Sequence, residues 1–259
     1  MAERSRQLAL PLHTHGGRRP GAGRKPGPRP IVPRIARDAL ASRFPVHVTL
    51  RVLEKVPTLR EEPMLSTLLD ALAAGADRLG MRVVQYSVQG DHLHLLVEAK
   101  GATSLQRAMQ GLSIRIAKAL NRLMGRKGKL FADRYHARIL RTPREVRAAL
   151  VYVLGNAHKH ALAKGRRLEG VDPCSSGPWF DGWRQGTVVG DAAGPRASVP
   201  ARTWLLQTGW RRYGLLEVGE LAGAGRRRLR KVPGHDERLS PGGAEGDAEA
   251  AQRPLLRRP

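Results

Sequence analysis

The spacing of apolar residues between residues 45 and 161 constrains the fold of this chain more than any other feature. In the segment 45–53 apolar and polar residues alternate, which is typical of a strand with one buried face, and three further short segments are interpreted as strands. In three longer segments apolar residues recur every three or four positions, which is typical of helices with one buried face. In chain order the pattern predicts a strand at 45–53, a helix at 64–79, strands at 82–88 and 92–98, a helix at 104–124, a strand at 130–140 and a helix that begins after Thr142.

The first six of these elements have the order of a ferredoxin-like split βαβ unit. We therefore predict an α+β fold, in which one antiparallel sheet carries helices on one face and the last helix is added at the C-terminal end. The other face of the sheet would be free to hold a substrate. The last helix has a clear start, because Thr142 is followed by Pro143 at the first helical position and by Glu145 three residues after the cap.

The chain is strongly basic. Its 259 residues include 46 Lys and Arg but only 22 Asp and Glu, which gives a formal net charge of +24. An excess of Arg over Lys is also typical of a GC-rich genome, but that bias does not explain the excess of basic over acidic residues. A protein of this charge is drawn to polyanions, and nucleic acid is the first partner to expect.

Composition divides the chain into four parts. Residues 1–40 form a basic arm rich in Gly and Pro, which we expect to be disordered, and residues 41–161 form the compact domain. Residues 162–221 contain all four Trp residues and should form a partly ordered extension, and residues 222–259 read as a disordered tail. The predicted fold is thus flanked by flexible basic extensions.

Several classes of protein are disfavoured by what the sequence lacks. The single cysteine, Cys174, excludes an internal disulfide and a Cys-based zinc cluster. No segment approaches the roughly 20 apolar residues of a membrane span, and the first residues lack the apolar run of a signal peptide. We expect a cytoplasmic protein that associates with the nucleoid and has no membrane partner.

The triplet His92-Leu93-His94 is the first candidate for a functional site. Residues two apart in a strand point to the same face of a sheet, so both imidazoles would project together. Two neighbouring imidazoles suit a divalent metal. A lone His-x-His also occurs as two polar residues on a solvated sheet face, so the triplet alone does not decide between these interpretations.

Tyr152, Asn156 and Lys159 form a second candidate group on the last helix. At spacings of four and seven their side chains share one helix face, beside the buried stripe. A phenol, an amide and an ammonium group in a row could serve attack on a phosphate. The alternatives are a half-buried aromatic for Tyr152 and a helix cap for Asn156, which follows Gly155.

These motifs together resemble those of the single-tyrosine HUH transposases, in particular the group associated with repetitive extragenic palindromes (REPs). The segment Gly90-Asp-His-Leu-His-Leu-Leu96 resembles the HUH motif, in which U is a hydrophobic residue, and Tyr152-Val-Leu-Gly-Asn156 resembles the tyrosine motif. Phe131-Ala-Asp-Arg-Tyr135 also fits the resemblance. Two departures are Asp91, where relatives often have Asn, and Ala157, where many have Pro.

The resemblance implies a reaction and its ligands. His92, His94 and Asn156 would hold Mg²⁺ or Mn²⁺, and Tyr152 would attack a phosphodiester in single-stranded DNA at or near a hairpin. The product would be a 5′-phosphotyrosine link and a free 3′-OH, and reversal with a second 3′-OH would rejoin DNA. A phenol has a solution pKa of about 10, so the metal or a nearby cation must favour the phenolate. Among relatives both homodimers and monomers occur, and the sequence leaves this open.

Several basic residues are candidates for DNA contact. In the loop after residue 124 they are Arg126, Lys127 and Lys129, and on the last helix Lys159. In the N-terminal arm the candidates for hairpin or groove contact are Arg18, Arg19, Arg24 and Lys25.

Other interpretations remain open at this point. A non-catalytic or domesticated protein that binds DNA or RNA hairpins would need only the charge and the fold, although the sheet lacks the aromatic residues of RNA-recognition modules. A metal-dependent hydrolase would need a carboxylate base, and Asp91 should point away from His92. Tyr135 is the second candidate nucleophile. His158 and His160 are a poor metal pair, because residues two apart on a helix point in different directions.

Overall fold

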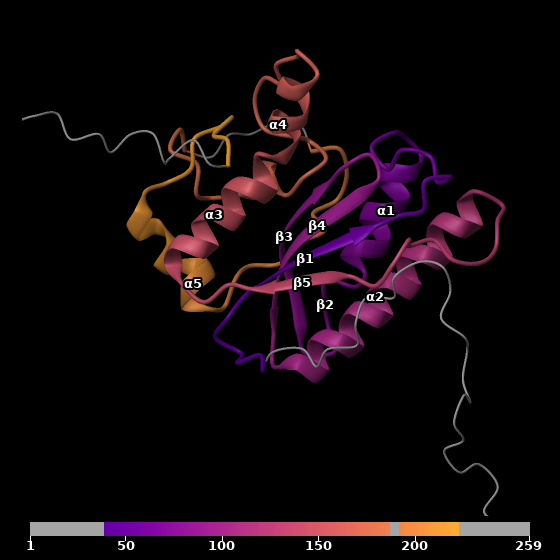
Figure 1. The fold of residues 1–259 in the computed structure, drawn as a ribbon, viewed down its shortest axis with the longest axis horizontal. Coiled ribbons are helices and arrows are strands. Elements are labelled where there is room, and N and C mark those ends of the chain that lie inside the picture. The colour runs from indigo at the N-terminus through magenta and orange to yellow at the C-terminus, as the bar shows by residue number, and fades with distance from the viewer. Residues whose placement is uncertain (1–38, 187–191, 223–259) are drawn as a thin grey trace, which may run out of the picture.

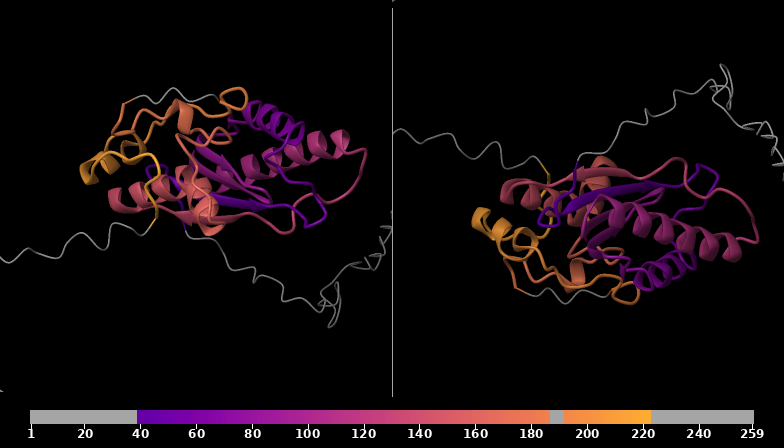
Figure 2. Two further views of the ribbon diagram at one scale, coloured as in Figure 1. Left: turned by 90° about the horizontal axis from the view of Figure 1, so that it is seen from above. Right: turned by 90° about the horizontal axis from the view of Figure 1, so that it is seen from below.

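A computed structural model describes residues 39–186 and 192–222. The N-terminal arm with Arg18, Arg19, Arg24 and Lys25, and nearly all of the predicted tail, lie outside the described residues. Within them a five-stranded antiparallel sheet forms the centre, with helices on both faces (Figures 1 and 2).

The sheet confirms the predicted fold class. Its strand order is β2-β3-β4-β1-β5, and every neighbouring pair is antiparallel. Without the two-residue edge strand β2, this is the strand order of a ferredoxin-like sheet. The strands are β1 (Val46–Arg51), β2 (Asp77–Arg78), β3 (Met81–Val88), β4 (His92–Ala99) and β5 (His136–Ile139). Strand β5 is shorter than the predicted segment 130–140.

Helices α1 (Met64–Ala73) and α2 (Ala102–Leu123) cover one face of the sheet, as predicted. Their leucines pack against the inward residues of β1, β3 and β4 in one aliphatic core. The predicted end of the first helix at residue 79 is wrong, because α1 stops at Ala73 and residues 77–78 pair with β3. Just after the helix, Gly75 packs closely on α2, since a Cβ there would lie 2.7 Å from the Leu112 side chain.

Helix α3 (Pro143–Leu154) packs on the other face of the sheet, against β3 and β4. It begins at the predicted capping box, in which the Thr142 hydroxyl accepts a hydrogen bond from the Glu145 amide and the Glu145 carboxylate accepts one from the Thr142 amide. The buried side of α3 meets Val84 and Leu96 of the sheet. The second face is therefore partly covered, and it is not fully open as the sequence suggested.

The expectation of one continuous last helix is wrong. Helix α3 ends at Leu154, and Asn156 is the first residue of a separate helix, α4 (Asn156–Ala163). The break falls at Gly155, where a Cβ would lie 2.6 Å from the Glu220 carbonyl and 2.7 Å from the Val151 carbonyl. Close approach of residue 220 therefore requires glycine at this position and redirects the chain. Tyr152 and Asn156 do not share the face of a single helix.

Residues after α4 fold back over α3 and form a second, aromatic core with it. This segment contains η1 (Gly177–Trp179), α5 (Trp204–Gln207) and η2 (Gly209–Tyr213). Trp210 is fully buried, stacks on Phe180 with ring centroids 5.6 Å apart, and donates its indole N–H to the Leu206 carbonyl. Trp183 packs edge-on against the same phenyl ring.

Polar contacts tie this extension to the domain. Glu98, buried on β4, accepts hydrogen bonds from the backbone amides of Arg202 and Thr203 at 2.9 and 2.7 Å. On α3, Arg147 donates to the carbonyls of Gly214 and Leu215 and pairs with Glu220 at 2.7 Å. The extension therefore holds α3 against the sheet from outside. Of the helices in the described ranges, none is long and apolar enough to cross a membrane.

Candidate active site

Two histidines of β4 lie on the sheet face that α3 partly covers. They alternate with Leu93, which is buried in the core below α1 and α2. The ring centroids of His92 and His94 are 4.7 Å apart. Strand β1 runs beside them, with Arg51 opposite His92 and Thr49 opposite His94. Strand alternation thus brings the two imidazoles together.

Tyr152 reaches this pair from the last turn of α3. Its ring centroid lies 5.1 Å from that of His94, with an angle of 76° between the ring planes. A second contact, at 5.6 Å and 63°, joins Tyr152 to His47 of β1. Tyr152 is half-buried, because α3 crosses the sheet at this point. Packing of α3 on β4 therefore places a phenol against an imidazole that lies far from it in sequence.

Two of the three predicted metal ligands have a buried polar atom without a hydrogen-bond partner among the described residues. These atoms are Nε2 of His94 and Oδ1 of Asn156, whose residues are only 3 % and 2 % exposed. A buried polar atom left unpaired costs about 1–3 kcal/mol. Imidazole nitrogen and amide oxygen both bind divalent ions, so the unpaired atoms fit an ion held by His92, His94 and Asn156. Within 39–186 and 192–222 no three His, Cys, Asp or Glu residues form a metal cluster, which leaves an amide as the candidate third ligand.

Asp91 contacts His92 directly, and the expectation that it points away is wrong. Its Oδ1 accepts a hydrogen bond from His92 Nδ1 at 2.6 Å, and its Oδ2 lies 2.9 Å from the Arg51 guanidinium. Asp91 sits in the turn before β4, where strand alternation does not apply. The hydrogen bond from His92 is the main reason that the pKa of Asp91 is lowered. The carboxylate thus orients His92 and leaves Nε2 of that ring as the nitrogen available to a ligand.

His47 and Thr49 of β1 belong to the site but were missed as site residues. Nδ1 of His94 lies 3.1 Å from Thr49 Oγ1 and 3.3 Å from His47 Nε2. Burial is the main cause that lowers the pKa of His94 to about 3 and that of His47 to about 4, so both rings are neutral at pH 7. The alternation of the first predicted strand contained the signal, because it puts both side chains on one face. The predicted ferredoxin-like order puts β1 beside β4, but nothing in the sequence sets the register of that pair.

The two histidines of α4 diverge, as helix geometry predicts. His158 is buried and its Nε2 lies 2.9 Å from the Gly170 carbonyl. His160 is exposed, and its ring centroid is 6.2 Å from that of His92. Burial is the first cause, and nearby His92 the second, that lower the pKa of His160. His160 is therefore a further residue at the edge of the site, four positions after Asn156.

Within the described residues, the basic residues named from the sequence lie on α4 and in the loop after α2. Lys159 of α4 is exposed, with its ammonium group 5.9 Å from the Tyr152 ring centroid. The loop 125–129 reaches the end of β1, where Val52 pairs with Phe131, on the side of β1 away from β4. There Arg126 donates to the Lys129 carbonyl and Lys129 to the Ala132 carbonyl, while Lys127 is exposed.

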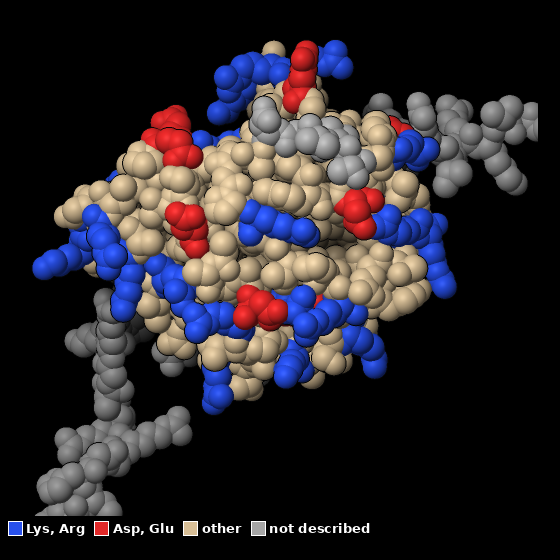
Figure 3. Space-filling view, turned by 180° about the vertical axis from the view of Figure 1, so that it is seen from behind, with Lys and Arg blue, Asp and Glu red and all other residues tan. Residues whose placement is uncertain are grey.

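Positive charge extends over much of the surface. The side of the molecule opposite to that of Figure 1 carries more Lys and Arg than Asp and Glu, and they are spread over it without forming a single patch (Figure 3). Tyr135, the second candidate nucleophile, is half-buried against the core below α1 and α2.

Comparison with solved structures gives several partial likenesses. A REP-associated tyrosine transposase bound to a REP hairpin matches at 13 % identity and a TM-score of 0.43, over 64 % of this chain and 97 % of that one. A proposed transposase from Deinococcus radiodurans matches at 19 % identity and a TM-score of 0.32, over 52 % of this chain and 98 % of that one. A bacterial tRNA(His) guanylyltransferase-like protein in complex with GTP matches at 15 % identity and a TM-score of 0.35, over 48 % of this chain and 67 % of that one. At these scores the likenesses carry no weight for function.

Comparison with curated proteins gives no significant match. The model of a protein family, by contrast, matches residues 41–153 and is described as IS200-like transposase. The matched range runs from just before β1 to the end of α3, so it includes both histidines of β4 and Tyr152. Over residues 41–153 the chain is therefore similar to the IS200-like transposases.

Proposed function

We propose that this chain is a metal-dependent, single-tyrosine transposase of the HUH type, which cleaves and rejoins single-stranded DNA at or near hairpins. The observation that carries the proposal is the contact of the Tyr152 ring with His94, at 5.1 Å between centroids. A nucleophile must lie within reach of the groups that hold the reacting phosphate. In this chain α3 supplies the proposed nucleophile, Tyr152, and β4 supplies the histidines proposed to act on the phosphate.

Each residue has a role in the proposed reaction. His92, His94 and Asn156 would hold Mg²⁺ or Mn²⁺, and an ion bound there would polarise the scissile phosphate. The Tyr152 oxygen forms a bond to phosphorus, and the bond from phosphorus to the 3′ oxygen breaks. The phenol proton leaves to solvent, and the departing 3′ oxygen takes up a proton. The ammonium group of Lys159, 5.9 Å from the Tyr152 ring centroid, attracts the phosphate by its charge.

The intermediate is a 5′-phosphotyrosine, and it explains how the strands are rejoined. Attack by a 3′-OH of another strand restores a phosphodiester and releases Tyr152. The number of phosphate ester bonds is conserved in each step, so the exchange needs no nucleoside triphosphate. Arg126, Lys127 and Lys129 are proposed to contact the DNA backbone beside the C-terminal end of β1, together with Arg18, Arg19, Arg24 and Lys25 of the N-terminal arm.

The test is a denaturing gel of the full chain with labelled single-stranded hairpin DNA from the flanks of its own gene, with Mn²⁺ or with EDTA. We expect a protein–DNA adduct that needs the metal and is absent in Tyr152→Phe. Tyr213→Phe is the matched control, because Tyr213 is 54 % exposed and lies in the extension. Tyr135→Phe tests the second candidate nucleophile.

The same gel tests the metal ligands. His94→Ala should abolish the adduct, whereas His136→Ala, an exposed histidine of β5, should leave it intact. An adduct that survives in Tyr152→Phe would assign the nucleophile elsewhere. Hairpin binding without any adduct, across several flanking sequences, would replace the proposed reaction by the non-catalytic binding function.

A further inference from the structure

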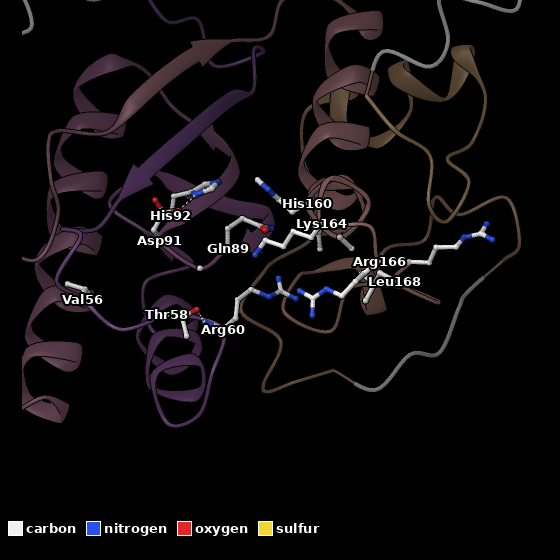
Figure 4. Close-up of a pocket in the computed structure, with 14 residues that line it drawn as sticks. Val56, Thr58, Arg60, Gln89, Asp91, His92, His160, Lys164, Arg166 and Leu168 are labelled. Atoms are coloured by element: carbon white, nitrogen blue, oxygen red, sulfur yellow. Dashed lines mark hydrogen bonds and ion pairs between the residues drawn. The ribbon is translucent and has the colours of Figure 1, made fainter.

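A cavity of about 690 Å³ adjoins His92. Three segments line it: the loop 56–60 before α1, the β3–β4 turn at 89–92, and residues 157–168 of α4 and the loop after it (Figure 4). His160 and Lys164 project from the α4 side, and the Lys164 side chain extends toward the β3–β4 turn. The cavity thus continues from the candidate metal ligands along α4.

Two charged groups of the lining are already paired. Arg60 donates to both carboxylate oxygens of the fully buried Asp172, at 2.6 and 3.0 Å, and also to the Val88 carbonyl. Asp91, the carboxylate that lines the cavity, is engaged by His92 and Arg51. These contacts build the walls of the cavity and contribute little free charge to it.

Three basic side chains of the lining have no such partner. Lys164, Arg166 and Arg167 are exposed, and in the part of the chain that the structure describes none of them forms an ion pair. The lining therefore has an excess of positive charge, which favours an anion. Beside it lie apolar groups and two polar side chains: Val56, Ala157, Ala161, Leu168, Thr58 and Gln89. An anionic group next to an apolar one is the chemistry of a nucleotide.

We propose that this cavity binds a nucleotide of the single-stranded DNA next to the scissile phosphate, with Lys164, Arg166 and Arg167 at its phosphate and the apolar wall at its base or sugar. The position relative to the scissile phosphate rests on the proposed function, because His92 lies at the rim of the cavity. The volume is in the range of pockets that take small ligands, about 300–1,000 Å³. Exposed His160 at the rim offers a ring on which a base can stack.

The first test measures binding of labelled single-stranded DNA by fluorescence anisotropy at several salt concentrations. Loss of one phosphate contact should reduce the slope of log K against log salt by roughly 0.7. We expect Lys164→Ala/Arg167→Ala to reduce the slope and weaken binding. The matched control, Arg107→Ala/Lys118→Ala, removes the same charge from exposed positions of α2, on the other face of the sheet, and should have a smaller effect.

The second test locates the nucleotide. Oligonucleotides are shortened by one or two nucleotides on either side of the cleavage position. One of these truncations should weaken binding to the wild type but make no further difference in Lys164→Ala/Arg167→Ala. Equal slopes for the pocket and control variants would overturn the pocket assignment. Displacement of the oligonucleotide by an equal concentration of free mononucleotide would also overturn it, because the cavity would then be a mononucleotide site.

The two proposals fail separately. If Tyr152 forms the adduct but the pocket and control variants have equal salt slopes, the nucleotide pocket is refuted and the assignment of Tyr152 as nucleophile stands. If the salt slopes of the pocket and control variants differ clearly but no adduct forms, DNA binding in the pocket is supported and the proposed reaction is refuted.

Independent contacts around His94 carry a second inference. A neutral imidazole has one N–H, on Nδ1 or on Nε2. On Nε2 the hydrogen would be buried without an acceptor, because that atom has no partner within the described chain. On Nδ1 it can be donated to Thr49 Oγ1 at 3.1 Å or to His47 Nε2 at 3.3 Å. We infer that Thr49 and His47 are positioning residues, which hold His94 with its hydrogen on Nδ1 and a free lone pair on Nε2.

Nitrogen NMR of the histidine rings in the metal-free protein tests this directly, with His94→Gln to assign the signals. The wild type should show His94 with a protonated Nδ1, and Thr49→Val/His47→Phe should shift the population toward protonated Nε2. The conservative pair Thr49→Ser/His47→Gln should restore the wild-type pattern. Calorimetric titration with Mn²⁺ should show a loss of affinity of about 10–100-fold in the first pair only. A wild-type His94 with its hydrogen on Nε2, or an unchanged pattern in Thr49→Val/His47→Phe, would overturn the inference.

Discussion

Replacement of Arg147 by lysine should loosen the contact between α3 and the end of the extension. The Arg147 guanidinium donates to the Gly214 carbonyl at 2.9 Å, to the Leu215 carbonyl at 3.1 Å and to both Glu220 oxygens at 2.7 and 3.0 Å. A single ammonium group can keep the attraction to Glu220 but cannot span the two carbonyls. Each lost hydrogen bond is worth about 1 kcal/mol net, so we expect a loss of about 2 kcal/mol.

Urea unfolding followed by two probes measures this loss and locates it. All four Trp residues lie in the extension, so tryptophan fluorescence reports on the extension, while far-UV circular dichroism reports mainly on the domain. With a denaturant slope of about 2 kcal/mol/M, the fluorescence midpoint of Arg147→Lys should fall by about 1 M. If the extension separates from α3 first, fluorescence will change before circular dichroism.

Arg144→Lys is the matched control, because Arg144 is exposed on the same helix. Its midpoint should stay near that of the wild type. The adduct assay should show slower reaction in Arg147→Lys, since a loosened α3 holds Tyr152 less well against His94. Equal midpoints in the two arginine variants would refute the view that the extension clamps the tyrosine helix.

Three further predictions concern the same region. Burial lowers the pKa of His47 to about 4 in the folded protein. As the pH falls from 6.5 to 4, the unfolded chain binds a proton on His47 but the folded protein does not, so the free energy of unfolding decreases. The stability that comes from keeping His47 neutral is therefore complete above pH 6.5 and lost at about pH 4. It amounts to about 3 kcal/mol, and unfolding of wild type and His47→Gln between pH 4 and 7 should show the difference. Thr142→Ala should cost about 1 kcal/mol in thermal or urea unfolding, because it removes the capping box with Glu145. Gly155→Ala should reduce both stability and adduct yield, since its Cβ would meet the Glu220 carbonyl at 2.6 Å; an unchanged midpoint would show that the backbone at residue 220 can move aside.

Much of the fold follows from local pattern. Period-two and helical spacing located β1, β3, β4, α1, α2 and α3, because burial of one face forces that spacing on a strand or helix. The short strand β2 and the separate helix α4 were missed. Thr142, Pro143 and Glu145 fixed the start of α3, because a capping box uses only neighbouring backbone groups. The same local reasoning placed His92 and His94 on one face of β4 and showed that His158 and His160 diverge.

The end of the first helix and the break at Gly155 could not be read from local pattern. Gly75 and Gly155 matter through what approaches them, Leu112 of α2 and the carbonyl of Glu220, and those contacts exist only in the folded chain. Asp91 was misjudged because the turn before β4 has no strand alternation.

The composition of the site was decided by tertiary structure. His47 and Thr49 join His94 because β1 pairs with β4 in a register that sets Thr49 opposite His94. Tyr152 meets these rings because the aromatic core of the extension presses α3 onto the sheet. The sequence by itself determined which side chains share a face of each element, since that depends on helix and strand geometry alone. Which faces meet depends on packing between segments far apart in the chain, and that packing is what completes the site.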